Sequence, residues 1–244
     1  MQAALLPRDT YPKGKGYWST KVLTETLSKY PQAVVFGGHL HFPLNDPRRV
    51  WQGAFTVMGT ASTRYMAIDN GGYEEMAGLT VMKDKDEFSQ GLLLQFDNKG
   101  NMRAVRMDFY NQTTIGKHWV FRRPAEDGAH LRKYDHKRLA AANKAPSLKG
   151  LKVKAISGGA VATWPAGTDD EFVHTYYLTV AAGDSTVCTK KILADFYRVP
   201  QASQMKKTWR QELKLASGEY TVSLFARDSW DAESNMLTEE VVVL

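Results

Sequence analysis

The residues best suited to chemistry are two histidines, His39 and His41, which lie one residue apart in the segment VVFGGHLHFPLND. A neutral imidazole is a good ligand for zinc, manganese, iron or nickel. Gly37 and Gly38 precede the pair and allow backbone dihedrals that would turn both rings toward one site. The segment therefore predicts a metal site, and a purely structural role for both histidines is the alternative.

The elements before this pair predict a sheet covered by a helix. Residues 19–30 have apolar side chains at the helical period, with Ser19 or Thr20 as the N-cap and Pro31 as the stop. The wholly apolar segment 33–36 follows and predicts a short buried strand. A helix that leads into such a strand is typical of a covered α/β sheet. The histidines would then follow the carboxyl end of a strand, where open α/β sheets form their ligand sites.

The rest of the first half predicts further strands. Residues 53–62 form one, and residues 91–97 and 101–111 flank the turn DNKG as a hairpin. Residues 124–148 lose the strand pattern between two prolines and predict a linker, with a short helix at about 134–143.

From residue 149 onward, about seven short strands separated by turns predict an immunoglobulin-like sandwich. The segment LASGEYTVSLFARDSWDAESN resembles the end of a fibronectin type III domain, because Leu215 precedes Tyr220 at the spacing of a tyrosine corner. Trp164 resembles the core tryptophan of that family. The resemblance covers residues 149–244 and implies a fold rather than a function.

The segment around the histidines resembles the last sequence block of calcineurin-like metallophosphoesterases, a strand followed by Gly-His-x-His. This resemblance covers residues 1–123 and implies the C-terminal portion of an α/β catalytic domain with two metal ions. It implies that His39 binds one metal and His41 the other. Asn45 and Arg48 follow as polar groups suited to a phosphate. The predicted fold class is thus α/β of the βαβ type, followed by an all-β sandwich.

The chain departs from that family because the earlier ligand blocks are missing, and only Asp9 and Glu25 are acidic before His39. We therefore expect a fragment of a longer phosphoesterase that hydrolyses phosphate mono- or diesters. We expect its divalent ions (Mn, Zn, Fe or Ni) to be incomplete or absent in this chain, which alone would be inactive. An exposed half-domain surface would favour homo-oligomers. The fibronectin-like part suggests, by analogy, an exported bacterial parent that is periplasmic or secreted.

The amino-acid composition argues against several other classes of protein. The single cysteine, Cys188, excludes an intramolecular disulfide and is interpreted as a small buried hydrophobe. The net charge of +6 is unevenly spread, because residues 1–123 hold 16 basic and 11 acidic residues and so carry +5 of it, which weakly favours an anionic ligand there. No basic-aromatic pattern indicates a nucleic-acid surface, and no apolar stretch has the length of a membrane span. The first 16 residues lack the features of a signal peptide.

The alternative function is a non-catalytic binding module for protein or glycan on a degenerate scaffold. Four aromatic residues of the sandwich could form a carbohydrate platform, although core packing explains them equally well: Tyr176, Tyr177, Trp209 and Trp230. The other histidines are expected to be non-functional. His118 is placed on a strand surface or in a linker, His130 and His136 in a solvated linker, and His174 in a structural position.

Overall fold

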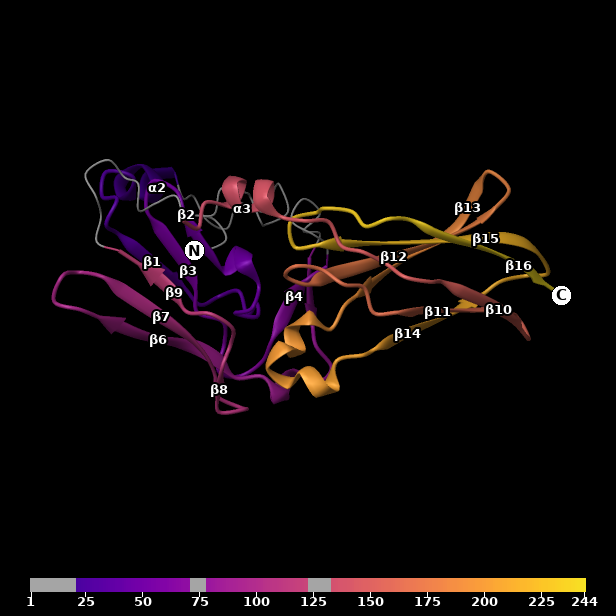
Figure 1. Ribbon diagram of the computed structural model, residues 1–244, viewed down its shortest axis with the longest axis horizontal. Coiled ribbons are helices and arrows are strands. Elements are labelled where there is room, and N and C mark those ends of the chain that lie inside the picture. Colours follow the sequence, from indigo (N-terminus) through magenta and orange to yellow (C-terminus); the bar gives the residue numbers. More distant parts are fainter. Residues whose placement is uncertain (1–20, 71–77, 123–132) are drawn as a thin grey trace. The chain divides into compact units, whose positions relative to one another are not determined.

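The computed structural model describes residues 21–70, 78–122 and 133–244 (Figure 1). Strand accounts for 46% of the structure and helix for 14%. The chain divides into two compact units. Unit 1 holds the described residues up to 142 together with 199–202, and unit 2 holds 143–198 and 203–244.

The first sheet of unit 1 has the order β1-β3-β2, from β1 (Val34–Gly37), β2 (Val50–Gln52) and β3 (Thr56–Gly59). Strands β1 and β3 are parallel, whereas β2 and β3 are antiparallel. One face of this sheet packs against α2 (Lys21–Leu27), where Leu23 and Leu27 contact the buried Phe55 and Val57. Burial of these apolar side chains stabilises a seven-residue helix that would be marginal alone.

The second sheet of unit 1 contains β6 (Gln90–Phe96), β7 (Met102–Asp108), β8 (Thr113–Thr114) and β9 (Trp119–Phe121). The predicted hairpin is confirmed, because β6 and β7 pair antiparallel in an unbroken register. A smaller pair consists of β4 (Ala67–Asp69) and β5 (Leu79–Val81), and the short 3₁₀ helices η1 (Pro47–Arg49) and η2 (Lys85–Glu87) complete the unit. The main core joins side chains of the first sheet to side chains of the second, including Val50, Met58, Ala104 and Trp119.

The segment expected to be a solvated linker contributes to unit 1. The predicted short helix is confirmed as α3 (His136–Ala142). His136, however, is buried, and its Nε2 lies 2.9 Å from the Val50 carbonyl oxygen. The Tyr134 amide donates to the Gln52 side chain at 3.1 Å. The prediction that His136 is solvated is therefore wrong, because β2 offers its ring a buried hydrogen-bond acceptor.

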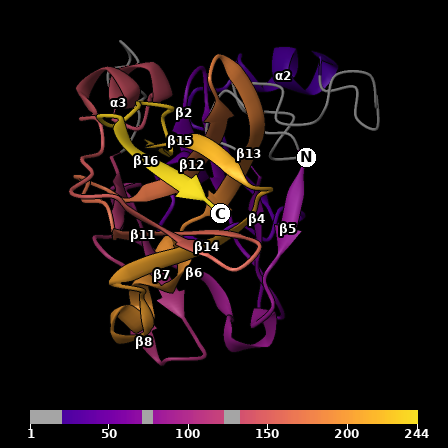
Figure 2. The ribbon, with the colours of Figure 1, turned by 90° about the vertical axis from the view of Figure 1, so that its right-hand side faces the viewer.

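Unit 2 is a fibronectin type III-like sandwich of two antiparallel sheets, which lie in separate layers (Figure 2). One sheet has the order β10-β11-β14 and the other the order β13-β12-β15-β16. The strands are β10 (Lys152–Ile156), β11 (Gly159–Pro165), β12 (Val173–Ala182), β13 (Ser185–Leu193), β14 (Thr208–Lys214), β15 (Gly218–Asp228) and β16 (Leu237–Val243). The 3₁₀ segment η4 (Phe196–Gln204) lies between β13 and β14.

Two residues expected from the fibronectin resemblance take their predicted places. Trp164 is fully buried, with its ring 5.6 Å from that of Tyr176. The Tyr220 hydroxyl donates to the Ala216 carbonyl at 3.1 Å, which is the hydrogen bond of a tyrosine corner. Cys188 is half-buried rather than buried, because it lies on the exposed strand β13.

The predicted α/β fold class is wrong, since the described part of the chain is mostly strand. The one parallel pair among the described strands, β1 and β3, is connected through η1 and β2 rather than through a crossover helix. No βαβ unit is therefore formed by these strands. Strand β1 is also only partly buried, and Phe36 is 41% exposed. The expected caps Ser19 and Thr20, together with Asp9 and His130, lie outside the described residues.

Candidate functional site

The loop after β1 carries the predicted metal ligands. His39 is exposed, whereas His41 is half-buried with its ring centroid 4.1 Å from that of Tyr65. Burial lowers the pKa of His41, a backbone hydrogen bond of the ring to Tyr65 opposes this shift, and the nearby His39 lowers the pKa further. The Thr60 hydroxyl and amide both donate to the Gly37 carbonyl, which fixes the start of this loop.

The same loop is anchored by a buried group of charges. Arg48 is 3% exposed, and its guanidinium donates to Asp46 on its own loop and to Asp69 at the end of β4. The contacts are 2.9 Å from Nε to Asp46 Oδ1 and 2.9 Å from Nη2 to Asp69 Oδ1. Although burial favours the neutral acid, the charge and hydrogen bonds of Arg48 lower the pKa of Asp46. Burial lowers the pKa of Arg49 to about 10, and its guanidinium lies 4.5 Å from the Phe42 ring centroid.

The predicted site residues lie close together in the sequence but differ in burial and in hydrogen-bond partners. In the part of the chain that the structure describes, no three His, Cys, Asp or Glu side chains gather closely enough to hold a metal ion. Metal binding by His39 and His41 stays a prediction, as does phosphate binding by Asn45 and Arg48. Asn45 is half-buried, and the guanidinium of Arg48 is occupied by two carboxylates.

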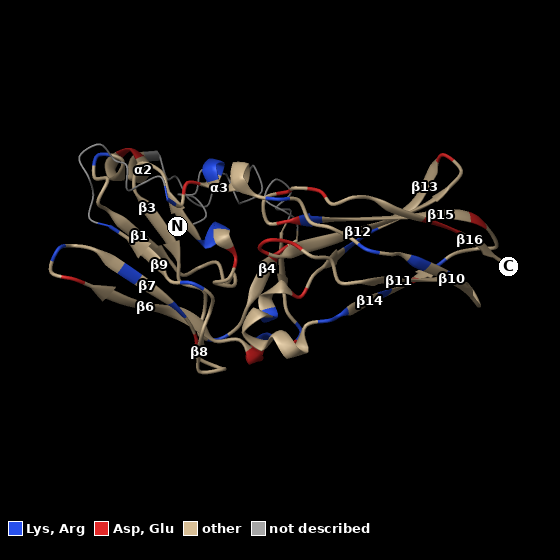
Figure 3. Ribbon diagram, in the orientation of Figure 1, with Lys and Arg blue, Asp and Glu red and all other residues tan. Residues whose placement is uncertain are grey.

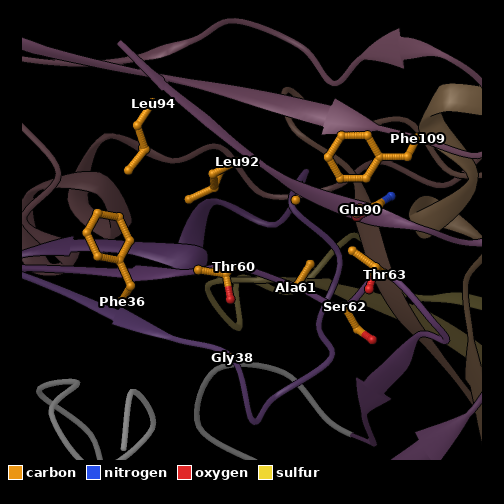
Figure 4. A pocket seen from close by; sticks show the side chains of 11 residues that line it. Phe36, Gly38, Thr60, Ala61, Ser62, Thr63, Gln90, Leu92, Leu94 and Phe109 are labelled. Carbon is orange, nitrogen blue, oxygen red and sulfur yellow. The ribbon is translucent and has the colours of Figure 1, made fainter. Parts of the chain in front are cut away.

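A groove of about 610 Å³ opens on unit 1 beside this loop (Figure 4). Phe36 of β1 and Phe109, just after β7, are exposed by 41% and 47%. Leu92 and Leu94 of β6 lie between them and are partly buried. None of the lining residues carries a charge: Phe36, Gly38, Thr60, Ala61, Ser62, Thr63, Gln90, Gly91, Leu92, Leu94 and Phe109.

Two local features shape the groove. A Cβ atom on Gly91 would lie 2.8 Å from the Phe109 ring, so glycine is required for that ring to cover β6. Ala61 has a φ of 55°, in the left-handed region, and this turns the chain after β3. The backbone at Gly91 and Ala61 therefore shapes the floor of the groove. The apolar side chains of β1 and β6 form its walls.

Both walls are edge strands. In the sheets formed by the described residues, β1 pairs only with β3 and β6 pairs only with β7. The Gln90 amide of β6 donates away from β7, to the Ser62 carbonyl at 2.8 Å. Because backbone groups alternate in direction along a strand, those of Leu92 and Leu94 face the open edge as well. The groove thus combines apolar side chains with two unused strand edges.

The aromatic platform considered for unit 2 is not found. Tyr176, Tyr177, Trp209 and Trp230 are all buried. The Tyr176 ring packs 5.2 Å from Trp209, and the Trp230 indole donates to Glu171 at 3.1 Å. These four residues therefore stabilise the sandwich and leave no flat aromatic face for a sugar.

Two of the other histidines lie where the sequence places them. The structural role expected for His174 is confirmed, since it is fully buried with Nδ1 2.8 Å from the Thr175 hydroxyl. His118 is exposed as predicted.

Sequence reasoning missed the groove residues themselves. The only signal was the uncharged segment QGLLLQF, which is β6. An apolar strand of this kind reads the same whether it is central or at an edge, so the pattern alone does not show that it borders a groove.

No protein-family model matches the sequence, and neither does any curated protein. Among solved structures, the chain is similar to domains d3–d4 of the rat CD45 extracellular region, with a TM-score of 0.31 and 12% identity over 67% of this chain and 73% of that one. It is also similar to a DUF3823 family protein from Bacteroides ovatus, with a TM-score of 0.31 and 8% identity over 80% and 92%. A third similarity is to the fibronectin(III)-like modules of Clostridium thermocellum CbhA, with a TM-score of 0.26 and 11% identity over 75% and 79%.

TM-scores this low are no evidence of function. The fold is therefore assigned from the strand pairings described above. Those pairings overturn the metallophosphoesterase prediction, because the resemblance implied a helix-covered α/β domain and the described chain is mostly β-sheet. The predicted fragment of a phosphate-ester hydrolase is therefore wrong. None of the described helices has the length and apolar character needed to cross a membrane.

Proposed function

We propose that this chain is a non-catalytic protein-binding module and that the groove of unit 1 takes an extended apolar segment of its partner. The observation that carries the proposal is the pair of open strand edges, β1 and β6, beside exposed apolar side chains. An added strand would satisfy backbone N–H and C=O groups of an edge while its alternate side chains enter the groove.

The chemistry of the lining favours binding over catalysis. Its polar side chains are Thr60, Ser62, Thr63 and Gln90, and no lining residue titrates. General acid–base catalysis requires a group that gains and loses a proton near the working pH. The lining offers none, whereas uncharged apolar walls suit the alternate side chains of a strand.

The same chemistry favours a protein partner over a glycan. Sugar recognition by stacking needs an exposed aromatic face, and the candidate aromatics of unit 2 are buried. Phe36 and Phe109 do lie in the groove, but they lie beside leucines and open strand edges as well as beside its hydroxyl and amide side chains. Backbone pairing along an edge is a property of polypeptide partners.

Peptide selection tests this function. A phage library of random strand-length peptides is panned against the wild-type chain, against Phe36→Asp, which puts a charge into the groove, and against Val187→Asp, which charges the exposed strand β13 of unit 2 as a control. We expect enriched peptides with alternating apolar residues that bind wild type and Val187→Asp and lose at least tenfold in affinity for Phe36→Asp. Circular dichroism checks that each variant is folded.

Enrichment that does not depend on Phe36 would contradict the proposed function, and so would a failure to enrich any peptide. A glycan-array signal that survives Phe36→Asp would contradict it as well, because the binding surface would then lie elsewhere.

A further inference from the structure

We infer that the segment bound in the groove belongs to a second copy of this chain, and that two copies pair through β6 to form a symmetric dimer. This inference rests on the proposed function, because it names the partner of the same groove. Three features of the chain support it: the side chains of β6, the symmetry of its pairing and the distribution of charge.

Strand β6 lacks the features that normally protect an edge. Residues 90–96 contain no charged residue and no proline, and their register with β7 is unbroken. Leu93 is 50% exposed and Phe96 is 70% exposed. Natural edge strands are usually protected by lysine, proline or a bulge, and an exposed, flat, apolar edge is expected to pair with another strand.

Strand β13 of unit 2 shows what a protected edge looks like in the same molecule. It is also an edge strand, but it carries Lys190 and Lys191 and its register with β12 shifts at Val180/Ala181. In Figure 3, β6 is free of charged residues along its length. Since β13 is protected and β6 is not, we expect β6 rather than β13 to pair with another strand.

The sequence of β6 is complementary to itself. With a two-fold axis through Leu93, antiparallel pairing places Leu92 of one copy opposite Leu94 of the other and Leu93 opposite Leu93. The backbone groups of Leu92 and Leu94 face the open edge, so they can exchange hydrogen bonds across the axis. A two-fold interface must use the same patch on both copies, and this strand meets that condition.

The distribution of charge fits the same partner. The chain carries a net charge of +6, so two copies repel each other wherever their basic surfaces approach. The groove lining and β6 are uncharged, and this patch is where two copies can meet without that repulsion. An acidic peptide would find no cation among the lining residues. An uncharged apolar strand fits this lining, and β6 is such a strand.

Light scattering coupled to size-exclusion chromatography tests the dimer. Wild type is measured over a wide range of concentrations beside Leu93→Lys, which places a charge at the proposed axis, and Val187→Lys, which makes the same kind of change on the exposed β13. We expect wild type and Val187→Lys to reach twice the monomer mass of 27.4 kDa and Leu93→Lys to stay at the monomer mass. An unchanged melting temperature shows that Leu93→Lys is folded.

Wild type that stays monomeric at every concentration would overturn the dimer, and so would a Leu93→Lys variant that still dimerises. Neither result would affect the peptide selection described above. A monomer that enriches apolar peptides in a Phe36-dependent manner would mean that the partner is a different protein. The two failures are therefore distinguishable.

Discussion

At the scale of single residues, Arg48 links two elements of unit 1 near the predicted site. Its guanidinium joins Asp46, which caps η1, to Asp69 at the end of β4. The loop after β1 is thereby held to a strand that lies 21 residues further along the chain. Arg48 thus acts as a tie between two elements, which explains why a basic residue in this loop is buried.

Replacing Arg48 by methionine keeps the bulk of the side chain and removes the guanidinium that the buried carboxylates of Asp46 and Asp69 contact. We expect the Arg48→Met substitution to lower the free energy of unfolding by about 3–5 kcal/mol. Urea denaturation measures this, with Arg64→Met, an exposed arginine on the next loop, as the control at about 0.5 kcal/mol or less. A loss for Arg48→Met no larger than that of the control would show that the pairing adds nothing.

His136 makes the stability of unit 1 depend on pH. Burial lowers its pKa from 6.5 to about 4, so the folded chain leaves the ring neutral where the unfolded chain protonates it. The unfolded state therefore binds more protons between pH 6.5 and 4, and stability is lost as the pH falls through that window. The loss from this group approaches about 1.4 kcal/mol per pH unit.

Urea denaturation at several pH values measures this loss. We expect His136→Gln to have a shallower dependence on pH than wild type, and His118→Gln, which changes an exposed histidine, to retain the wild-type dependence. Equal slopes for wild type and His136→Gln would contradict the assignment.

At the scale of elements, local patterns were sufficient where each strand pairs with its neighbour in the chain. The hairpin of β6 and β7 follows from the turn DNKG between two apolar runs, and Asp97 accepts amide hydrogen bonds from Lys99 and Asn101 inside that turn. The seven strands of the sandwich were expected for the same reason. Alternation and turn residues are local signals, so they can be found in the sequence.

The elements that were predicted wrongly depend on contacts between distant residues. The apolar run of β1 predicts a buried strand, yet it lies at a sheet edge, and Phe36 is exposed because nothing in the described chain pairs beyond it. The charged segment around His136 predicts a solvated ring, yet the ring is buried and its acceptor lies 86 residues away. No local pattern reports a burial that is created by a partner so far along the chain.

The metal site stays a prediction for a related reason. Two histidines at close spacing propose ligands, but the remaining ligands must come from other elements. The neighbouring carboxylates, Asp46 and Asp69, are bound to Arg48 instead. The spacing of His39 and His41 could therefore suggest a site, while only the tertiary contacts could show which groups are already in use.

At the scale of the whole molecule, the two units differ in how well their edge strands are protected from pairing. The described part of unit 2 presents its exposed edge β13 with lysines and a register shift. Unit 1 leaves an uncharged apolar edge beside an open groove. The chain as a whole is basic, so this uncharged surface is a place where a second copy can pair without meeting charge repulsion.

Hydrogen exchange at the amides of Leu92 and Leu94 tests strand pairing in the groove most directly. Their N–H groups face the open edge, so they should exchange quickly in the Leu93→Lys monomer at low concentration. A peptide with the sequence of residues 88–99, or a rise in wild-type concentration, should slow their exchange at least tenfold and leave the exposed β13 unchanged. Exchange at Leu92 and Leu94 that responds to neither would contradict the account.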